Sequence, residues 1–293
     1  MNKLKLAKQI TNLHAKTYSM GIKMFPKEIQ NATYSLYLFV RETDDIIDET
    51  NLTEEDAKIQ LTNWINNWNH YYYHNTHENT SFILLKQLLD KYNIPKYLID
   101  DFLEAMIQDT NKNRYESYQD LKSYMHGSAE VIGKIMAIIL EADPHVYIHA
   151  KALGEAFQLT NFIRDIKEDY NKRNRIYIPN NILIKYNSSH KDIEENNLTP
   201  ELIETIKYLI NYNRNLYNLA RQGIHSINPK TQFGITLAIN LYEAILTQIE
   251  KENYDIFKKR IYVNTINKII IFIKTKMNFR ISKSKYYYHT VKY

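Results

Sequence analysis

The stretch GEAFQLTNFIRDIKED (residues 154–169) places short oxygen-bearing side chains at intervals of three or four residues. An α-helix turns by about 100° per residue, so Gln158, Asn161, Asp165 and Asp169 would share one narrow helix face. A polar face is most often a solvated face. Solvated faces usually carry Lys and Glu, however, whereas two Asp, an Asn and a Gln resemble a set of oxygen ligands for a cation. This segment alone leaves both interpretations open.

A second stretch, RETDDIID (residues 41–48), repeats the spacing, because Asp44 and Asp48 are again separated by one helical turn. Each aspartate pair follows an apolar stretch, and an arginine stands just before each pair, Arg41 in one and Arg164 in the other. One acidic pair is a weak signal that could be a solvated helix end. Two pairs with the same spacing in one chain favour a shared site.

Packed across a helical bundle, the two pairs would place at least four carboxylates around one cavity. In a site of low dielectric constant their repulsion would be severe without cations. Mg²⁺ prefers a few carboxylates plus phosphate oxygens and water, so two or three Mg²⁺ ions, with Mn²⁺ as a substitute, would join the aspartates to a diphosphate. Positive charge for the same anion would come from Arg41, Arg164, Lys172, Arg173 and Arg175.

A magnesium site at the mouth of an apolar cavity suits the ionisation of an allylic diphosphate. The metal stabilises the departing diphosphate, while the carbocation remains in the apolar pocket. Aromatic faces can shelter that cation without trapping it. The candidates are Tyr37, Tyr124, Phe157 and Phe162, although an aromatic residue on a bundle helix is more often simply part of the core.

The composition is that of a helical globular protein. Of 293 residues, 44% are hydrophobic and 24% charged, with only 6 Gly and 6 Pro; periodic apolar segments follow one another and alternating strand patterns are nearly absent. The absence of cysteine excludes disulfides, thiolate metal sites and a cysteine nucleophile. The first residues lack the apolar block of a signal peptide, and no apolar run reaches the ~18 residues of a membrane span, so we expect a cytoplasmic protein.

The periodicity predicts an all-α, single-domain bundle over residues 1–293, in which about 283–293 form a basic tail that we expect to be disordered. The predicted helices cover residues 3–19, 26–50, 53–73, 79–92, 95–111, 117–142, 145–171, 180–187, 200–223, 229–253 and 255–282.

Four stretches of the sequence resemble the squalene/phytoene synthase family in residues, order and spacing: RETDDIIDE, YMHGSAEVIG (124–133), LGEAFQLTNFIRDIKEDYNKRNRIYIP (153–179) and YEAILTQIEKENYDIFKKRIYV (242–263). The third stretch is highly specific, whereas the first alone would fit many isoprenoid enzymes. The details are most similar to phytoene synthases of bacterial and archaeal type. The likeness extends over essentially the whole chain.

The resemblance implies an isoprenoid-synthase helical bundle with a central apolar cavity, and Mg²⁺-dependent head-to-head condensation of two prenyl diphosphates. In that reaction one substrate ionises and the C2–C3 double bond of the other attacks its cation. The product of this step is a cyclopropylcarbinyl diphosphate. A second ionisation rearranges the intermediate, and loss of a proton gives a conjugated triene.

The resemblance also implies roles for individual residues. The metal ligands would be Asp44, Asp48, Asp165 and Asp169, with Asn161 assisting. The diphosphate contacts would be Arg41, Arg164, Tyr242 and Arg260. The reacting centre would be lined by Gln158, Tyr124 and Tyr177, and further substrate contacts would come from Thr17 and Tyr18. One thin wall of the lipid tunnel would be made by Gly127, Ala129 and Gly133, although their spacing fits close helix packing equally well.

Four positions depart from the family pattern. Within HAKTY (14–18), Ala15 and Thr17 replace the two serines of a Ser-x-Ser-Phe-like element. Lys134 follows Gly133 where an apolar residue is usual, and a charge at the tunnel wall would be costly unless the side chain extends outward. Asn174 takes the usual place of a glycine. No departure removes a metal ligand.

We expect the substrate to be geranylgeranyl diphosphate and the product phytoene, a precursor of carotenoids. The alternative is dehydrosqualene or squalene synthesis from farnesyl diphosphate; squalene formation would need NADPH, which we do not expect here. A non-catalytic relative, such as a family-related assembly factor, would typically lose acidic ligands that this chain keeps. A head-to-tail prenyltransferase or terpene cyclase would call for a second DDxxD or an Asn-Ser/Thr-Glu motif, where this chain has DIKED.

The formal net charge is +5, and Lys and Arg are dense toward the carboxyl end. Together with a long apolar product, this basic segment predicts peripheral contact with an anionic membrane surface. We expect prenyl diphosphates as substrates, no nucleic-acid partner, and a monomer or weak dimer.

Overall fold

The computed structural model describes the backbone of residues 3–48, 53–76 and 78–290, and the side chains of these ranges except those of residues 48 and 280–290. Within these ranges the chain forms helices, turns and one isolated β-bridge, between Arg114 and Ile176, and no β-strand. The predicted all-α bundle is therefore confirmed. Among the described helices, none is long and apolar enough to cross a membrane.

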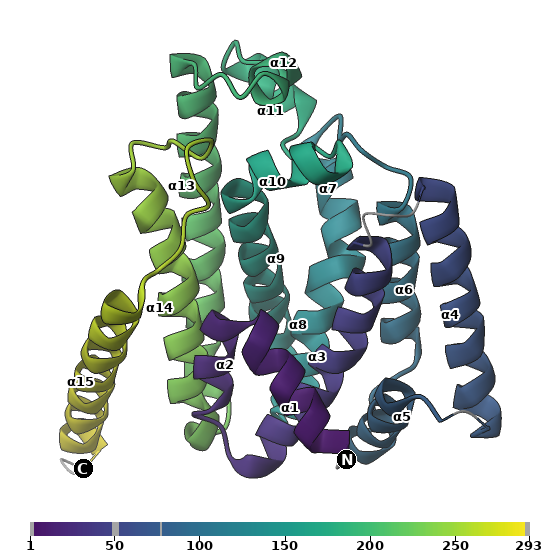
Figure 1. The fold of residues 1–293 in the computed structure, drawn as a ribbon. Coiled ribbons are helices and arrows are strands. Elements are labelled where there is room, and N and C mark those ends of the chain that lie inside the picture. The colour runs from purple at the N-terminus through teal and green to yellow at the C-terminus, as the bar shows by residue number, and fades with distance from the viewer. Residues whose placement is uncertain (1–2, 49–52, 77, 291–293) are drawn as a thin grey trace.

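The helices stand around a common centre, with the short helices α7, α10, α11 and α12 at one end of the bundle (Figure 1). Their bounds are α1 (Lys3–His14), α2 (Lys16–Ile22), α3 (Lys27–Asp48), α4 (Glu54–His74), α5 (Thr80–Tyr92), α6 (Tyr97–Asp109), α7 (Tyr118–Met125), η1 (His126–Glu130), α8 (Val131–Ile139), η2 (Pro144–Val146), α9 (Tyr147–Arg164), α10 (Ile166–Arg173), α11 (Asn180–Lys185), α12 (His190–Glu194), α13 (Pro200–Gln222), η3 (Ile224–Ser226), α14 (Pro229–Lys251) and α15 (Thr265–Thr290).

Helix α9 lies between the two largest groups of core residues. Phe162 packs into the group formed mainly by α3 to α8, whereas Leu159 and Ile163 pack into the group formed mainly by α11 to α14. Burial of apolar surface on both sides fixes the rotation of α9 about its axis. The remaining face of α9, which carries Gln158 and Asn161, is thereby directed into the space between the two groups.

Two predicted helices are interrupted where they meet the central cavity. The helix predicted over 3–19 breaks at Ala15, whose backbone leaves the helical region (φ −116°, ψ 52°). The helix predicted over 145–171 breaks at Asp165 (φ −101°, ψ 11°), so the assumption of one continuous helix was wrong there. The Asp165 carboxylate is bonded to two arginines, and Asp is a poor residue for a helix interior. A backbone hydrogen bond of 2.8 Å from Asp169 N to Asp165 O nevertheless keeps these two residues one turn apart.

Three further predictions of helix extent are also corrected. The segment predicted over 117–142 contains a wider π-helical turn, η1. Between the helices predicted over 180–187 and 200–223 lies a further short helix, α12. The helix predicted over 255–282 begins only at Thr265, because the Asn264 side chain accepts a hydrogen bond from Asn267 N (2.8 Å) and caps its first turn. Helix α15 runs to Thr290, and its side chains from residue 280 onward lie outside the described part, so disorder of the basic tail remains a prediction.

The crossing of α9 with η1 depends on a glycine. A Cβ atom at Gly154 would lie 2.3 Å from Ala129 O and 2.9 Å from Ala129 C, which are backbone atoms of the neighbouring helix. No side chain could rotate away to make room, so the two helices would have to separate.

We therefore expect Gly154→Ala to lower the free energy of unfolding by about 2–4 kcal/mol, measured by urea denaturation. The matched control is Gly21→Ala, where a Cβ would lie 3.0 Å from the Ala238 methyl carbon and 3.2 Å from Gly234 O, contacts that a shift of a few tenths of an ångström relieves. An equal loss in the two variants would contradict the argument.

Candidate active site

A large cavity of about 780 Å³ lies in the middle of the bundle. Its inner part is apolar and is lined by Ile22, Phe25, Met136, Leu140 and Val146. Its outer part is lined instead by charged and amide side chains. The volume is within the range of cavities that enclose a small-molecule ligand.

A smaller, strongly polar cavity of about 290 Å³ adjoins the outer part of the large one. Its acidic lining residues come from α3, α6, α10 and the α9–α10 junction, and they are Asp44, Asp109, Asp165, Glu168 and Asp169. The two cavities share the lining residues Val40, Asp44, Ser128, Gln158, Asn161, Arg164 and Arg260. A polar, acidic compartment thus opens onto an apolar one.

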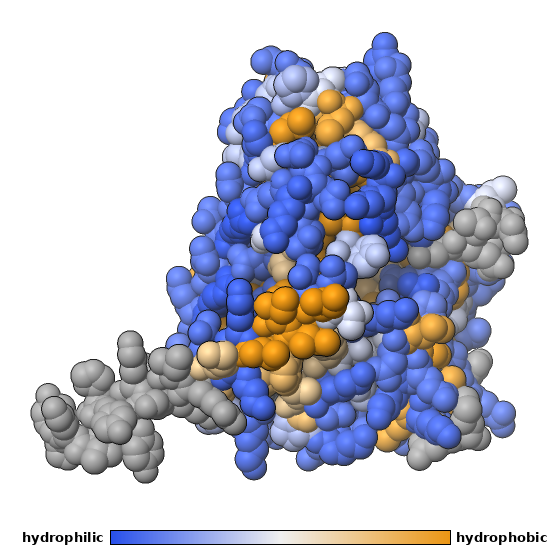
Figure 2. Space-filling model, turned by 60° about the vertical axis from the view of Figure 1, so that its left-hand side comes forward, coloured by the Kyte–Doolittle hydropathy of each residue, from blue (hydrophilic) through white to orange (hydrophobic). Residues whose placement is uncertain are grey.

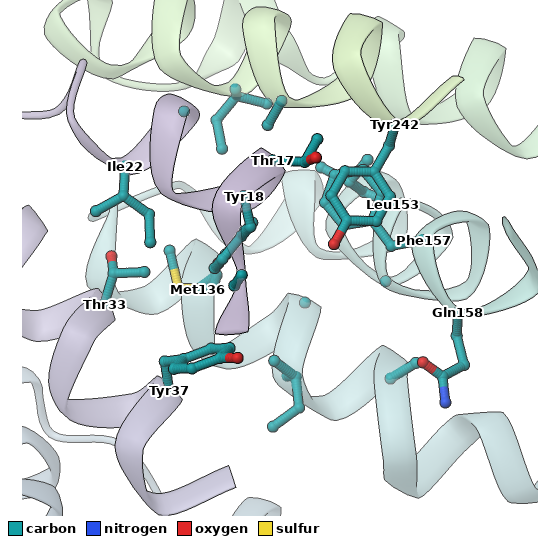
Figure 3. A pocket seen from close by; sticks show the side chains of 18 of the residues that line it. Thr17, Tyr18, Ile22, Thr33, Tyr37, Met136, Leu153, Phe157, Gln158 and Tyr242 are labelled. Atoms are coloured by element: carbon teal, nitrogen blue, oxygen red, sulfur yellow. The ribbon is translucent and has the colours of Figure 1, made fainter. Parts of the chain in front are cut away.

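Aromatic rings project into the large cavity from opposite sides (Figure 3). Tyr18 and Tyr37, from α2 and α3, lie with ring centroids 6.5 Å apart, and Phe157 and Tyr242, from α9 and α14, lie 4.3 Å apart. Burial raises the pKa of Tyr37 to about 12 and also raises the pKa of Tyr242. At neutral pH the cavity therefore presents neutral hydroxyl groups and aromatic faces rather than phenolate nucleophiles.

The carboxylate of Asp165 is held by two arginines. Arg164 Nε donates to Asp165 Oδ1 at 2.8 Å, and Arg260 Nε donates to the same oxygen at 3.0 Å. Although burial alone would raise it, the pKa of Asp165 is held below its ordinary value by these guanidinium groups. Asp165 is ionised, and its charge is balanced by residues that also line the large cavity.

Asp169 has the opposite electrostatic environment. Burial, and next the negative charge of Asp165, raise the pKa of Asp169 to about 8. Two aspartates one turn apart therefore differ in charge near neutral pH. A cation bound between Asp165 and Asp169 would offset the negative charge of Asp165, which helps to raise the pKa of Asp169.

Asp109 is a site residue that sequence reasoning missed. It is buried at the end of α6, where Arg175 Nη1 donates to its Oδ2 at 2.9 Å and the Tyr177 hydroxyl donates to its Oδ1 at 2.8 Å. The prediction that Arg175 would bind the substrate anion was therefore wrong, because its charge is committed to Asp109 inside the protein. The available signal was weak: one Asp at the end of the apolar stretch DFLEAMIQD.

The tyrosines predicted for the reacting centre lie in the wall of the small cavity. Tyr124, Phe162 and Tyr177 are stacked, with centroids of Phe162 and Tyr177 3.9 Å apart. Burial and then the nearby charge of Asp109 raise the pKa of both Tyr124 and Tyr177 well above the ordinary value. Both hydroxyls are thus protonated at neutral pH, and the proton of Tyr177 is directed at Asp109 Oδ1.

The structure brings the other predicted site residues to the same place. The large cavity is lined by Thr17, Tyr18, Arg41, Asp44, Gln158, Asn161, Arg164, Tyr242 and Arg260, and the small one by Asp44, Tyr124, Gln158, Asn161, Asp165, Asp169 and Tyr177. Asp48 is the last residue of α3, and its side chain lies outside the described part. The chemical roles of all these residues remain predictions.

Of the residues predicted for the tunnel wall, Ala129 and Gly133 line the large cavity. Gly127 instead faces α6, where a Cβ would lie 2.5 Å from Asp101 O. The Lys134 side chain extends outward, as the cost of burying a charge requires, and its Nζ donates to the Tyr97 hydroxyl at 2.8 Å.

The donor set of the small cavity fits the predicted Mg²⁺ in kind, since it consists of carboxylate and amide oxygens. Asp165 is at present bonded to arginines rather than directed at its acidic neighbours. Accordingly, no group of three His, Asp or Glu side chains within the described part is already arranged around a metal position. The chemistry of the residues suits the ion, and binding would require Asp165 to exchange its arginine partners for it.

An apolar cavity enclosed by helices, with facing acidic and basic side chains at its mouth, defines the class of helical isoprenoid synthases. The sequence model of one family, described as squalene/phytoene synthase, matches residues 11–267. The chain belongs to the squalene/phytoene synthase family, whose members are prenyltransferases that join prenyl diphosphates head to head.

Individual relatives agree with this assignment. The chain is 28% identical to a phytoene synthase of Arthrospira platensis over 279 residues, which is 90% of this chain and 89% of the relative. It is 27% identical to a 15-cis-phytoene synthase of Synechococcus elongatus, covering 89% and 88%. Among solved structures, a dehydrosqualene synthase shares the fold with a TM-score of 0.84 at 22% identity, covering 95% of this chain and 96% of that one.

A squalene synthase from Alicyclobacillus acidocaldarius also shares the fold, with a TM-score of 0.77 at 23% identity, covering 86% of this chain and 94% of that one. These structural similarities support the helical architecture.

The raised pKa of Asp169 predicts a stability effect in the metal-free protein. The folded carboxyl titrates near pH 8 and the unfolded one near its ordinary value, so stability is lost as the pH rises through this window. We expect Asp169→Asn to raise the free energy of unfolding by about 1–3 kcal/mol at pH 8 in EDTA, and by less at pH 5. Urea denaturation at the two pH values measures this.

Asp165→Asn is the matched control for that experiment and should have the opposite sign. Its carboxylate is ionised and bonded to Arg164 and Arg260, so its neutralisation should destabilise the protein at pH 8. Destabilisation by both substitutions would show that the two carboxyl groups do not differ as described.

The buried pair of Asp109 and Arg175 predicts a second, larger effect. Asp109→Ala leaves a guanidinium buried without its partner, and we expect a loss of about 3–5 kcal/mol in the free energy of unfolding. The control is Glu204→Ala, which removes the acid of an exposed ion pair with Lys207 and should change stability by less than about 1 kcal/mol. Similar small changes in both would mean that Asp109 is not committed to Arg175.

Proposed function

We propose that this protein condenses two molecules of geranylgeranyl diphosphate head to head to form phytoene, with Mg²⁺ as cofactor, as a step of carotenoid biosynthesis. The observation that carries the proposal is the junction of the two cavities, where Asp44, Asn161 and Arg164 face an acidic compartment on one side and an apolar one on the other. The C20 substrate is chosen because relatives matching about nine-tenths of the chain are phytoene synthases.

In this proposal the metal would be held by Asp44, Asn161, Asp165 and Asp169, together with Asp48, which follows Asp44 by one turn of α3. When bound there, Mg²⁺ supplies positive charge to the diphosphate that leaves. Asp169 would bind in its ionised form, which its position beside Asp165 disfavours in the free protein.

Arg164 and Arg260 would bind the diphosphate itself. Both guanidinium groups are already at the junction, hydrogen-bonded to Asp165. Once that carboxylate is neutralised by another cation, the arginines can turn to phosphate oxygens, for which their paired N–H groups are suited. Before substrate binds, the Asp165 carboxylate thus balances the positive charges of Arg164 and Arg260.

The hydrocarbon chains would occupy the apolar part of the large cavity, out of contact with water. The carbocation formed by ionisation would lie among the faces of Tyr37, Phe157 and Tyr242 (Figure 3). Gln158 lies at the junction, and the protonated hydroxyls of Tyr124 and Tyr177 border the diphosphate side. The Tyr124 hydroxyl would donate a hydrogen bond to the leaving group during the second ionisation, whereas the Tyr177 hydroxyl donates its proton to Asp109 Oδ1.

The test is product identification with purified protein, Mg²⁺, and either the C20 or the C15 diphosphate, each with and without NADPH. We expect the C20 substrate to give a C40 triene and the reaction to stop in EDTA and recover on addition of Mg²⁺. A C30 product formed in preference would replace phytoene by dehydrosqualene or squalene. Diphosphate release with no dimeric hydrocarbon would refute head-to-head condensation.

The variant for this assay is Asp165→Ala. Loss of a metal ligand should reduce turnover at least about 100-fold, while circular dichroism shows unchanged helix content. Asp90→Ala is the control, since Asp90 is an exposed aspartate that is paired with Lys86 at 2.6 Å and lines neither cavity. Full activity of Asp165→Ala would contradict the assigned role.

A further inference from the structure

Helix α15 is attached to the bundle by one face. Asn240 Nδ2 of α14 donates to the buried hydroxyl of Thr275 at 2.9 Å, and Phe272 and Phe279 pack against Phe233 of α14, with centroids 5.8 and 5.6 Å apart. Ile271 completes this contact with the core. In Figure 1, α15 stands at the edge of the bundle beside α14.

The opposite face of α15 is apolar as well, yet it faces solvent. Five of its residues are 43–70% exposed: Ile266, Ile269, Ile270, Ile273 and Met277. Their spacing places them in one stripe about 100° wide along the helix. Figure 2 shows a continuous hydrophobic patch on the side of the molecule where α15 lies. We call these five residues the α15 stripe.

Basic side chains border the α15 stripe. The exposed Lys274 and Lys276 project on opposite sides of it, so their charged ends can lie level with lipid phosphates while their stems lie along the apolar residues. After Asp255 the sequence contains no acidic residue. An apolar stripe between cationic borders is the pattern of a helix that lies in a membrane interface.

We propose that the α15 stripe docks this protein on a lipid membrane that contains anionic phospholipids. A second copy of the chain fits this surface less well. Pairing of two stripes would bring Lys274 and Lys276 of both copies together, and α15 offers no carboxylate in its described side chains to neutralise them. Anionic headgroups complement these lysines, and the acyl region receives the isoleucines.

The α15 stripe begins beside the mouth of the large cavity. Lys268, in the first turns of α15, lines that cavity together with Tyr262, which is 72% exposed, and Val263. Docking through α15 would therefore bring the cavity mouth near the bilayer. This link to release of an apolar product rests on the proposed function, whereas the docking surface itself does not.

The test is co-sedimentation with vesicles of phosphatidylcholine containing phosphatidylglycerol, without substrate. We expect the full chain to bind at low salt, to bind phosphatidylcholine vesicles weakly, and to be partly released by high salt. Ile269→Gln combined with Ile273→Gln should lower the partition coefficient at least about tenfold. Lys274→Gln combined with Lys276→Gln should reduce the salt-dependent part of binding.

The matched control is Ile59→Gln combined with Ile184→Gln, which changes two isoleucines that are 50% and 63% exposed on α4 and α11, away from α15. Binding of this control should equal that of the unaltered protein. Equal losses in the two isoleucine variants, or no binding of the unaltered protein at low salt, would overturn the proposal. A dimer in light scattering that the α15 variant dissociates would assign the stripe to a second copy instead.

Because the vesicle assay contains no substrate, its failure leaves the proposed condensation untouched. Conversely, the α15 variant should retain turnover of a detergent-dispersed substrate, since Ile269 and Ile273 do not line either cavity. Loss of turnover in detergent would show that the substitutions damage the site, and the vesicle result would then be repeated with Met277→Gln alone. Unchanged vesicle binding by that variant would count against the proposal.

Discussion

Repulsion between carboxylates that share one enclosed cavity is the constraint on which the site depends. Asp44 comes from α3, Asp109 from α6 and Asp169 from α10, and no apolar packing can satisfy these groups together. The protein answers in three ways: it pairs Asp109 with a buried arginine, holds Asp165 with two arginines, and favours the protonated form of Asp169. Protonation of Asp169 near neutral pH lowers the negative charge in the cavity. Under the proposed function, a bound cation would replace that proton.

The break in the helix at Asp165 follows from the same constraint. On a continuous helix from α9 through α10, the side chains of Asp165 and Asp169 would project from the same side of one straight axis. Leu159 and Ile163 in the core fix the orientation of α9. Because of the break, α10 can take a different direction. Asp165 can then bond to Arg260 on a distant segment, while the hydrogen bond from Asp169 N keeps the two aspartates adjacent. The direction of α10, and with it the position of Asp169, is thus set separately from that of α9.

The sequence predicted the all-α bundle and the two aspartate pairs from local spacing, whereas further lining residues, such as Tyr242 and Arg260, were implied by the family resemblance. Helical periodicity shows which residues share a face, and two aspartate pairs preceded by arginines are visible without coordinates. Partners far apart in the chain could not be predicted in this way. Asp109 attracts no attention in the sequence, and Arg175 was assigned there to the substrate anion. Only the packing of α6 against the segment after α10 reveals that one neutralises the other. The break at Ala15 and the cap at Asn264 are likewise decided by what surrounds them.

The two ends of the large cavity are formed by different kinds of elements. Its acidic end is formed by rigid helices whose apolar faces are buried on both sides, so the charges there are positioned by the core. Its mouth is formed partly by the non-helical segment that carries Arg260 and Tyr262 and leads directly into α15. A substrate with a charged head and a long apolar tail needs both properties, because the head requires fixed charges and the tail requires a route that avoids water. Arg260 is bonded to Asp165, and the segment that carries Arg260 leads within a few residues to the start of the α15 stripe. One short stretch of chain therefore joins the fixed charges to the apolar surface.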